Sequence, residues 1–525
     1  MCAATAAASL AGVSTLPDVT HDVPGYDVLI VGAGPGGLAT ALSAARHGAR
    51  VLVVDRHPGT STRPRATGIG LRTMEIFRVW GVADAVRERA VPVDVHASSG
   101  ATLVAPPRSS GRAGGYPPLR EILRVSPAVP LVCPQDLVEP VLADAVRRHG
   151  GQIRFGARLV GLQVRPDGVR AELATGERVG ARFVVGADGT RSTVRAALGI
   201  GLRQLGTWAQ AVQVLFRPDL APLLGRDGVV RLPHLLTLVE QPQPGALCPM
   251  GAGRWSYVAL RFDGGRPEIP QDWTATLRAA TGLAELAPEV LDVARFTLAA
   301  AVATTYRCGP GFLVGDAAHR TTPVAGIGLN TAVHDGHELG WKLAWVARGL
   351  AGQGLLDSHD AERGPVGLAA AQRSLDVEGR PTDGLASNLG HTHRSAVIAG
   401  TGRAPELRID LAARPGERAP HVWIRHAGAR VSTLDLFDGR LTLVTGEATG
   451  WARACGAFDL QVLGAGGGST LARAYRIGPD SAVLVRPDGR VAWRCDNRCC
   501  DPRLALAGAV ATALGHATTP TALAG

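Results

Sequence analysis

The sequence has almost no lysine. Lys342 is the only lysine among 55 basic residues, so the net charge of +10 rests on arginines, which are scattered singly along the 525 residues. Basic tracts with interleaved aromatic residues, which an electrostatic footprint on nucleic acid requires, are absent. We therefore expect no nucleic-acid partner.

Long apolar runs and paired cysteines are lacking as well. No uninterrupted apolar run is long enough to cross a bilayer, so we expect no membrane partner. The eight cysteines form no disulfide framework, and the densest group, "CDNRCC" at 495–500, lacks the paired spacing of a zinc site, so we expect no metal. Residues 1–25 carry no basic segment ahead of an apolar core, which predicts a disordered tail and a cytoplasmic protein.

What the sequence does contain is a glycine turn between two strands. Gly32, Gly34 and Gly37 fit the pattern G-x-G-x-x-G after the apolar run at 26–31. The first glycine permits a tight turn, the second lets the backbone approach a pyrophosphate, and the third lets helix and strand pack closely. Asp55 ends the next strand, where it accepts hydrogen bonds from ribose hydroxyls. The unit predicts a dinucleotide site, and FAD and NAD fit it equally.

Two further strands end in a glycine and a carboxylate. "VVGADGTRSTVR" ends a strand at Asp188-Gly189, and "FLVGDAAH" ends another at Gly315-Asp316. Ligands of open α/β sheets gather at the carboxyl ends of strands. Three such ends on one chain are hard to explain by packing, so we expect them to converge on one ligand.

The spacing of apolar residues predicts the elements around these motifs. Helical periodicity covers 71–80 and 135–149, and short alternating runs over 151–186 indicate an antiparallel meander that returns to the sheet. Strand-like pieces between Pro/Gly turns over 200–300 indicate a second, mainly β domain. Residues 330–348 form a long amphipathic pattern that ends before a glycine.

In this order the three motifs resemble those of the flavin-dependent aromatic hydroxylases, the class A monooxygenases of the p-hydroxybenzoate hydroxylase family. The resemblance covers nearly all of 26–370. The stretches "PRATGIGLRTMEIFRVWG", "LLDSHDAERGPVG" and "RVSTLDLF…VLVRPDGRVAWR" are similar to the aromatic polyketide hydroxylases, whose tail is a thioredoxin-like domain. In this tail Cys455 stands alone without C-x-x-C, so we expect packing or homo-oligomer contact from it and no dithiol chemistry.

The resemblance implies a fold and its divisions. We expect an α/β protein: a Rossmann-like FAD-binding domain with an inserted mainly β substrate domain and a C-terminal thioredoxin-like α/β domain. The expected bounds are 1–25 for the tail, 26–199 and 301–370 for the two parts of the FAD-binding domain, 200–300 for the substrate domain, 371–415 for a linker and 416–525 for the thioredoxin-like domain.

The resemblance also implies site residues. Asp316 matches the residue that binds the FAD ribityl chain, Arg65 in "RPRA" the mobile arginine that touches flavin and NADPH, and Pro323 a proline facing the substrate cavity. The implied cofactor-binding residues are Gly32, Gly34, Gly37, Asp55, Arg56, Arg65, Gln135, Asp188, Asp316, Gly328, Leu329 and Asn330. No catalytic protein residue is assigned, because the cofactors FAD and NADPH carry the chemistry.

The implied reaction is hydroxylation of a polycyclic aromatic, polyketide-type substrate. NADPH reduces FAD, O2 forms a C4a-hydroperoxide, and the electron-rich ring attacks its distal oxygen. Two alternatives stay open: Baeyer–Villiger-type oxygen insertion on the same scaffold, which the motifs do not separate from hydroxylation, and a flavin-containing drug-binding protein without turnover, against which Arg65 and Asp188 argue.

Several positions depart from the family pattern. Thr322 stands where a proline often precedes Pro323, Glu338 replaces an asparagine, and His391 and His393 occupy places where tyrosines are frequent. Three other histidines lie near the motifs. We expect a structural role for His319, and His334 and His337 lack a third metal ligand at a recognisable spacing.

Overall fold

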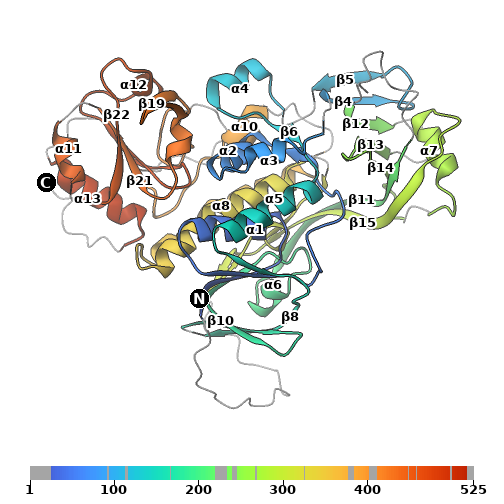
Figure 1. The fold of residues 1–525 in the computed structure, drawn as a ribbon, viewed down its shortest axis with the longest axis horizontal. Coiled ribbons are helices and arrows are strands. Elements are labelled where there is room, and N and C mark those ends of the chain that lie inside the picture. Colours follow the sequence, from blue (N-terminus) through green and yellow to red (C-terminus); the bar gives the residue numbers. More distant parts are fainter. Residues whose placement is uncertain are drawn as a thin grey trace.

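The computed structural model describes residues 25–91, 94–112, 116–165, 167–218, 233–238, 245–265, 269–323, 326–376, 384–400, 411–446, 449–456, 458–496, 499 and 501–516. Figure 1 shows three parts side by side: a central sheet with helices, a long curved β layer at one end and a small α/β part, drawn in red, at the other. None of the helices in these ranges is long and apolar enough to span a membrane.

The central sheet brings the three motifs to one edge. Its order is β16-β17-β10-β1-β2-β7, and β17, β10, β1, β2 and β7 are parallel. Since parallel strands end at the same edge, the residues that follow β1, β10 and β17 meet there, as the sequence predicted. The strands are β1 Tyr26–Val31, β2 Val51–Val54, β7 Gln152–Arg154, β10 Arg178–Gly186, β16 Arg307–Cys308 and β17 Gly311–Leu313.

The predicted meander and helices are present. β8 Leu159–Arg165 and β9 Gly168–Leu173 fold back on β10 as an antiparallel pair. The helices around the sheet are α1 Pro35–Arg46, α2 Leu71–Val79, α3 Ala83–Arg87, α5 Gln135–Arg148, α6 Thr193–Ala197, α8 Gly328–Ala347 and α9 Gly354–Arg373. The predictions for 71–80, 135–149 and 330–348 are thus confirmed to within two residues.

Helices α1 and α8 pack against each other in parallel at very short range. Gly36 lies against Ala332, Gly336 against the backbone of Thr40, and Gly340 against Thr40 and Ser43. Because contacts progress along both helices in the same direction, the two N-termini lie at the same end of the pair. A side chain at Gly336 or Gly340 would collide with α1, so the spacing of these glycines sets how close the helices come.

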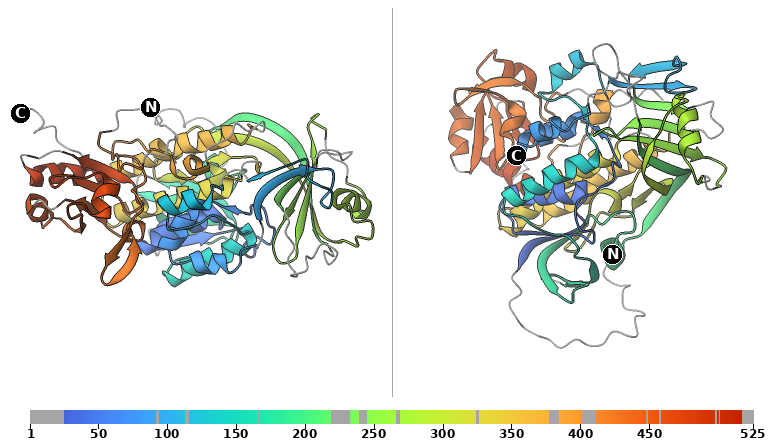
Figure 2. Two further views of the ribbon diagram at one scale, coloured as in Figure 1. Left: turned by 90° about the horizontal axis from the view of Figure 1, so that it is seen from above. Right: turned by 45° about the vertical axis from the view of Figure 1, so that its right-hand side comes forward.

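The second sheet uses more of the chain than the sequence indicated. Its order is β18-β15-β11-β14-β13-β12-β4-β5, and β4 and β5 come from residues 94–112, far ahead of the others in sequence. Figures 1 and 2 show these two blue strands on the edge of the green layer. The strands are β4 Asp94–Gly100, β5 Ser109–Arg112, β11 Leu202–Arg217, β12 Pro233–Leu238, β13 Gly245–Pro249, β14 Trp255–Arg261, β15 Glu289–Ala303 and β18 His319–Arg320.

Short elements connect these layers. β3 Gly68–Ile69 pairs with β6 Leu131–Val132 beside α2, and helix α7, Thr274–Thr281, packs on the β layer. Helix α4, Leu119–Val125, precedes β6, and α10, Gly384–Leu389, lies within the predicted linker.

The C-terminal part has a four-stranded sheet in the order β22-β21-β23-β24, in which β21 is parallel to β22 and antiparallel to β23. This mixed sheet with α11, α12 and α13 matches the predicted α/β tail, and the expected fold class is confirmed. The elements are β19 Trp423–His426, β20 Ala429–Ser432, β21 Leu441–Thr445, α11 Thr449–Cys455, β22 Leu460–Gly464, α12 Thr470–Tyr475, β23 Ala482–Val485, β24 Val491–Cys495 and α13 Pro502–Ala513.

The glycine contact between α1 and α8 gives a first prediction. A Cβ at Gly340 would lie 2.5 Å from the Ser43 Cβ and 2.6 Å from the Thr40 carbonyl oxygen. Gly340→Ala should therefore lower the free energy of unfolding by about 1–3 kcal/mol, as overpacking does. Gly508→Ala in α13, where nothing lies within 4 Å, should raise it by up to about 1 kcal/mol through helix propensity. Urea unfolding measures both, and equal shifts would contradict the packing argument.

Candidate functional site

The turn after β1 has a shape that only glycine provides. Gly32 has a φ of +109°, and a Cβ there would lie 2.2 Å from the Ala187 carbonyl oxygen. A Cβ at Gly37 would lie 1.9 Å from the carbonyl oxygen of Gly32, whereas the space above Gly34 is open. The first and third glycines therefore satisfy packing, and the second leaves the backbone accessible to a ligand.

The N-terminus of α1 is uncapped. Gly34 provides no side-chain cap, Pro35 follows it, and the first turn has no acidic residue. The first N–H groups of a helix have no partner within the helix and carry a partial positive charge. This end of α1 therefore fits the pyrophosphate of a dinucleotide.

Asp55 is tied to the same turn. Its Oδ2 accepts a hydrogen bond from the Ala33 N–H at 2.7 Å, and its Oδ1 accepts one from the His57 N–H at 2.8 Å. Each carboxylate oxygen keeps a further lone pair for a ribose hydroxyl. Arg56 beside it is exposed, and its Nε donates to the His57 ring at 3.3 Å.

Gln135 belongs to a polar group that includes a residue missed in the sequence. Its Nε2 donates to Glu139 Oε1 at 2.6 Å, and Glu139 Oε2 accepts from the Ser61 N–H at 2.6 Å. Burial raises the pKa of Glu139, although those hydrogen bonds and the charge of nearby Arg65 oppose the shift. Glu139 thus holds the loop that leads to Arg65. Its spacing of four from Gln135 on one helix was the available signal.

Asp188 has a role that its motif did not reveal. Its Oδ1 accepts a hydrogen bond from the Ser192 hydroxyl, and its Oδ2 accepts from the N–H groups of Thr193 at 2.6 Å and Val194 at 3.2 Å. The carboxylate therefore caps α6. Arg195 on the same helix donates to the Ala317 carbonyl oxygen at 2.9 Å and so joins this motif to the next.

Asp316 follows β17 in a short 3-10 turn, Gly315–Ala317. Its side chain is exposed and has no hydrogen-bond partner among the described residues. The surrounding protein still desolvates the carboxyl group and raises its pKa, against the positive charges of His319, Arg65 and Arg320. An acceptor without a partner among the described residues, within the electrostatic influence of Arg65, fits a ligand that offers hydroxyl donors such as a ribityl chain.

The N-terminus of α8 is the second uncapped helix end at the site. Ile327 gives no side-chain cap, and the first turn, which begins with Gly328 and Leu329, has no acidic residue. The Asn330 side chain is fully occupied: its Oδ1 accepts from the Gly70 N–H and the Thr73 hydroxyl, each at 2.7 Å, and its Nδ2 donates to two carbonyl oxygens. A cofactor would therefore meet backbone N–H groups here.

A buried carboxylate fixes the turn before Asp316. Asp335 of α8 accepts hydrogen bonds from the Gly315 N–H at 3.0 Å, the His319 ring at 2.6 Å and Arg363 Nε at 2.7 Å. Burial alone would raise its pKa, but Arg363 and His319 hold the pKa of Asp335 well below the usual range. His319 is 1% exposed, and its contact with Asp335 fits the structural role that the sequence predicts for it. Neither Asp335 nor Arg363 was identified from the sequence.

The remaining candidates lie as follows. Pro323 is exposed, next to residues 324–325, which lie outside the described ranges. His334 lies 3.1 Å from the Thr73 hydroxyl, and His337 packs on Trp80.

Metal-ligating types do gather at one place. Glu338, Glu362 and His393 bring their donor atoms close together in the interior. Both carboxylates already pair with basic groups: Glu362 with Lys342 and Arg486, and Glu338 with Arg363 at 3.5 Å. We therefore assign this group to ion pairing.

Comparisons with known proteins agree with this geometry. Residues 25–374 match the family model "FAD binding domain", and residues 412–517 match "Aromatic-ring hydroxylase, C-terminal". An aklavinone 12-hydroxylase of Streptomyces purpurascens is 36% identical over 545 residues, covering 93% of this chain and 98% of the relative. A tetracenomycin B2 monooxygenase-dioxygenase of Streptomyces olivaceus is 34% identical over 538 residues, covering 93% and 98%.

A solved structure is similar along almost the whole chain. It is a ternary complex of aklavinone-11 hydroxylase with FAD and aklavinone, with a TM-score of 0.85 and 34% identity, covering 94% of this chain and 99% of that one.

Buried histidines near the site predict an acid-sensitive fold. His359 of α9 donates through Nε2 to the Leu313 carbonyl oxygen at 3.0 Å, and burial lowers the pKa of His359 to about 4. The unfolded side chain titrates near 6.5. Between these values the unfolded chain binds more protons, so stability falls as the pH is lowered through this window, by up to about 1.4 kcal/mol per pH unit for each such histidine.

We therefore expect the free energy of unfolding, measured in urea, to decrease from pH 6.5 to pH 4.5. His359→Gln keeps a donor for Leu313 but does not titrate, so its pH slope should be shallower than that of the wild type. His426→Gln, at an exposed position, is the control for loss of a histidine. An unchanged slope in His359→Gln would refute this assignment.

Proposed function

Because this chain belongs to the FAD-dependent aromatic-ring hydroxylases, we propose that it hydroxylates a polycyclic aromatic polyketide. The enzyme is a FAD-dependent monooxygenase with NADPH as the reductant. The family models and the relatives thus confirm the main interpretation of the sequence. The substrate class is carried over from relatives named for aklavinone and tetracenomycin. Relatives named as hydroxylases and monooxygenases do not favour Baeyer–Villiger insertion or a protein without turnover.

The observation that carries the proposal is that polar protein groups without hydrogen-bond partners lie together and match the charges and hydroxyl groups of FAD. Two helix N-termini, those of α1 and α8, are uncapped and lie at the same end of a parallel helix pair. The turn that contacts both helices carries Asp316, a carboxylate without a partner among the described residues. Positive helix ends fit the negative parts of FAD, and the carboxylate fits its hydroxyl groups.

Each group has a proposed task. The N–H groups around Gly34 hold the pyrophosphate, Asp55 binds a ribose and Asp316 binds the ribityl hydroxyls. The first turn of α8, from Gly328, faces the pyrimidine edge and stabilises negative charge there. When bound, FAD would supply the chemistry that activates O2. NADPH would supply two electrons, one oxygen atom would enter the substrate ring and the other would leave as water.

The remaining site residues contact the flavin, NADPH or the substrate and orient them. Arg65 carries a positive charge close to Asp316 and Glu139. From this position it contacts flavin and incoming NADPH. Gln135, held by Glu139, contacts the flavin, and Asp188 connects the FAD and NADPH sites through the first turn of α6. Pro323 lines the substrate cavity. A cytoplasmic location and a homo-oligomer stay predictions.

The reaction itself is tested with purified protein. We expect yellow protein that oxidises NADPH and consumes O2 in equal amounts when an anthracyclinone or a tetracenomycin-type aromatic is added, with a product heavier by one oxygen that carries a new phenol. NADPH oxidation without substrate is the control. A lactone product would indicate Baeyer–Villiger insertion, and a colourless protein that does not take up FAD would refute the proposal.

Asp316 gives a more specific test. Asp316→Asn keeps the size of the side chain but weakens its hydrogen bonds to hydroxyl donors, so the Kd for FAD should rise about tenfold. Asp144→Asn on α5, where the native side chain is 62% exposed and pairs with Arg147 alone among the described residues, should leave the Kd unchanged. Flavin fluorescence titration of the apoprotein measures both, and equal affinities would remove Asp316 from the site.

A further inference from the structure

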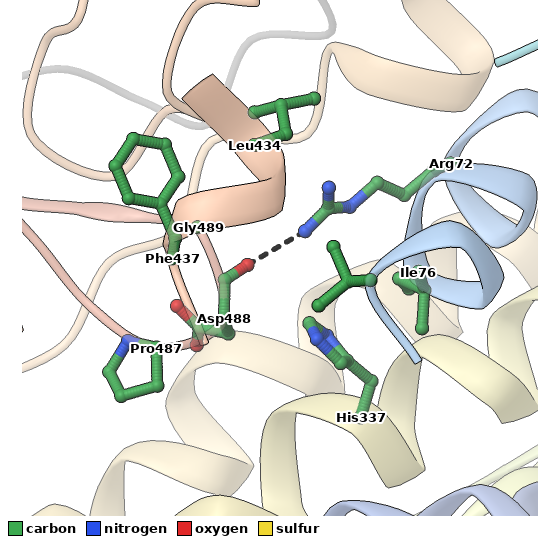
Figure 3. A pocket seen from close by; sticks show the side chains of 9 residues that line it. Arg72, Ile76, His337, Leu434, Phe437, Pro487, Asp488 and Gly489 are labelled. Carbon is green, nitrogen blue, oxygen red and sulfur yellow. Dashed lines mark hydrogen bonds between the residues drawn. The ribbon is translucent and has the colours of Figure 1, made fainter. Parts of the chain in front are cut away.

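The C-terminal domain contacts the rest of the protein through a buried charged turn. The turn is "RPDGR", residues 486–490, between β23 and β24, and its three charged side chains are at most 7% exposed. Figure 3 shows the turn opposite Arg72 of α2 and His337 of α8 across a small recess. Arg72 donates to the Asp488 carbonyl oxygen at 2.7 Å. The turn is therefore enclosed by helices that also frame the cofactor site.

The first arginine of the turn is held by carboxylates from two domains. Its Nη1 and Nη2 donate to the two oxygens of Glu362 on α9, at 2.6 and 2.9 Å, and it also pairs with Asp488. Lys342 of α8 donates to Glu362 Oε2 at 2.7 Å. All four side chains, including that of Arg486, are at most 2% exposed. Removal of one member would leave buried charge uncompensated, so the domain contact and the α8–α9 contact depend on each other.

The last arginine of the turn leads toward the cofactor. Arg490 Nη2 lies 3.4 Å from Glu338 Oε1 on α8, and Arg363 Nη1 lies 3.5 Å from the same oxygen. Arg363 Nε then donates to Asp335 Oδ1 at 2.7 Å, and Asp335 Oδ2 accepts from the Gly315 N–H at 3.0 Å. Four charged side chains thus form a continuous buried path from the C-terminal turn to the glycine beside Asp316.

This path ends on backbone that the cofactor would contact. Asp335 accepts from the Gly315 N–H, and Arg363 donates to the Thr331 carbonyl oxygen in the first turn of α8 at 3.3 Å. Toward the C-terminal end of the path, His393 also contacts Glu338, with its Nδ1 3.4 Å from Glu338 Oε2. Glu338 and His393 are two of the positions at which the chain departs from the family pattern, and in the fold they face each other.

We propose that Arg490 and Glu338 are positioning residues through which the C-terminal domain sets the geometry of the flavin site. Packed buried charges have few alternative arrangements, because any displacement separates a pair without replacing it by water. A shift of the RPDGR turn therefore moves Arg363 and Asp335, and with them the turn that carries Asp316. This inference rests on the proposed function, in which that turn binds FAD.

The test compares two arginines of the same domain. Arg490→Met removes the charge that reaches α8. Arg494→Met is the matched control. In the part of the chain that the structure describes, Arg494 bonds only to C-terminal residues and to the 411–416 segment, including the carbonyl oxygens of Tyr475 at 2.7 Å and Arg476 at 2.6 Å. We expect Arg490→Met to raise the Kd for FAD roughly tenfold, within the range known for coupling mutations, and Arg494→Met to leave it within about twofold. Arg490→Lys should restore part of the affinity, because it returns the charge.

The single lysine supplies a second readout. Lys342 is 0% exposed and belongs to the same ion-pair group, so an amine-reactive reagent should modify only the N-terminal amine of the folded protein. If the path holds the helices together, Arg490→Met should speed the modification of Lys342, detected by peptide mass mapping, and Arg494→Met should not. Bound FAD should slow it in the wild type, since the coupling acts in both directions.

The outcomes separate the two proposals. Wild-type protein that does not bind FAD would refute the proposed function. Wild-type protein that binds FAD, together with an unchanged Kd in Arg490→Met or equal losses in both arginine variants, would refute the positioning role alone. Should Arg490→Met fail to fold, Glu338→Gln, which keeps the size and hydrogen-bonding capacity of the side chain, takes its place with the same expected direction, and an unchanged Kd in that variant would again overturn the inference.

Discussion

The buried carboxylate of Asp335 is the contact on which the flavin-binding end depends. It joins the end of β17 to α8 and α9 by accepting hydrogen bonds from Gly315, His319 and Arg363. Breaking one side of such a buried pair typically costs about 3–5 kcal/mol, because the partner charge stays in the interior without compensation. The turn that presents Asp316 is therefore rigid although Asp316 itself has no partner among the described residues. A ligand that meets this carboxylate does not need to order the backbone behind it.

The close pair of α1 and α8 complements this contact. Gly336 and Gly340 bring the helices so near that the Ser43 hydroxyl reaches the His337 carbonyl oxygen at 2.9 Å. Because the helices are parallel, both positive ends reach the edge of the sheet where β1, β10 and β17 end. One end suits a pyrophosphate and the other suits the flavin ring, so a single packing arrangement provides two separate sites of positive potential for one long ligand.

The sequence allowed the fold around the motifs to be predicted but not its long-range contacts. Strand β1, the glycine turn and α1 were predictable because their apolar runs and glycine spacing are local signals. Strands β4 and β5 were not, since "DVHASSG" has little apolar alternation and its partner β12 lies more than a hundred residues away in sequence. The carboxylates at 55, 188 and 316 could be located, but the partners of Asp55 and Asp188 could not. Asp188 proved to cap α6, and Asp335 gave no motif of its own.

The same limit explains why the buried charges of the C-terminal contact were invisible in the sequence. The positively charged members of this contact are mainly arginines. A guanidinium can donate to two carboxylates at once, as Arg486 does with Glu362 and Asp488, and it retains its charge when it is desolvated. A lysine ammonium is a single point charge and lacks the planar fork of a guanidinium. Burial lowers the pKa of Lys342, and the charge of Glu362 opposes that shift. Lys342 is therefore tolerated because Glu362 lies at 2.7 Å. Such pairs between two domains couple the positions of the domains. Neither domain can move without exposing a charge to solvent or leaving a buried charge without its partner.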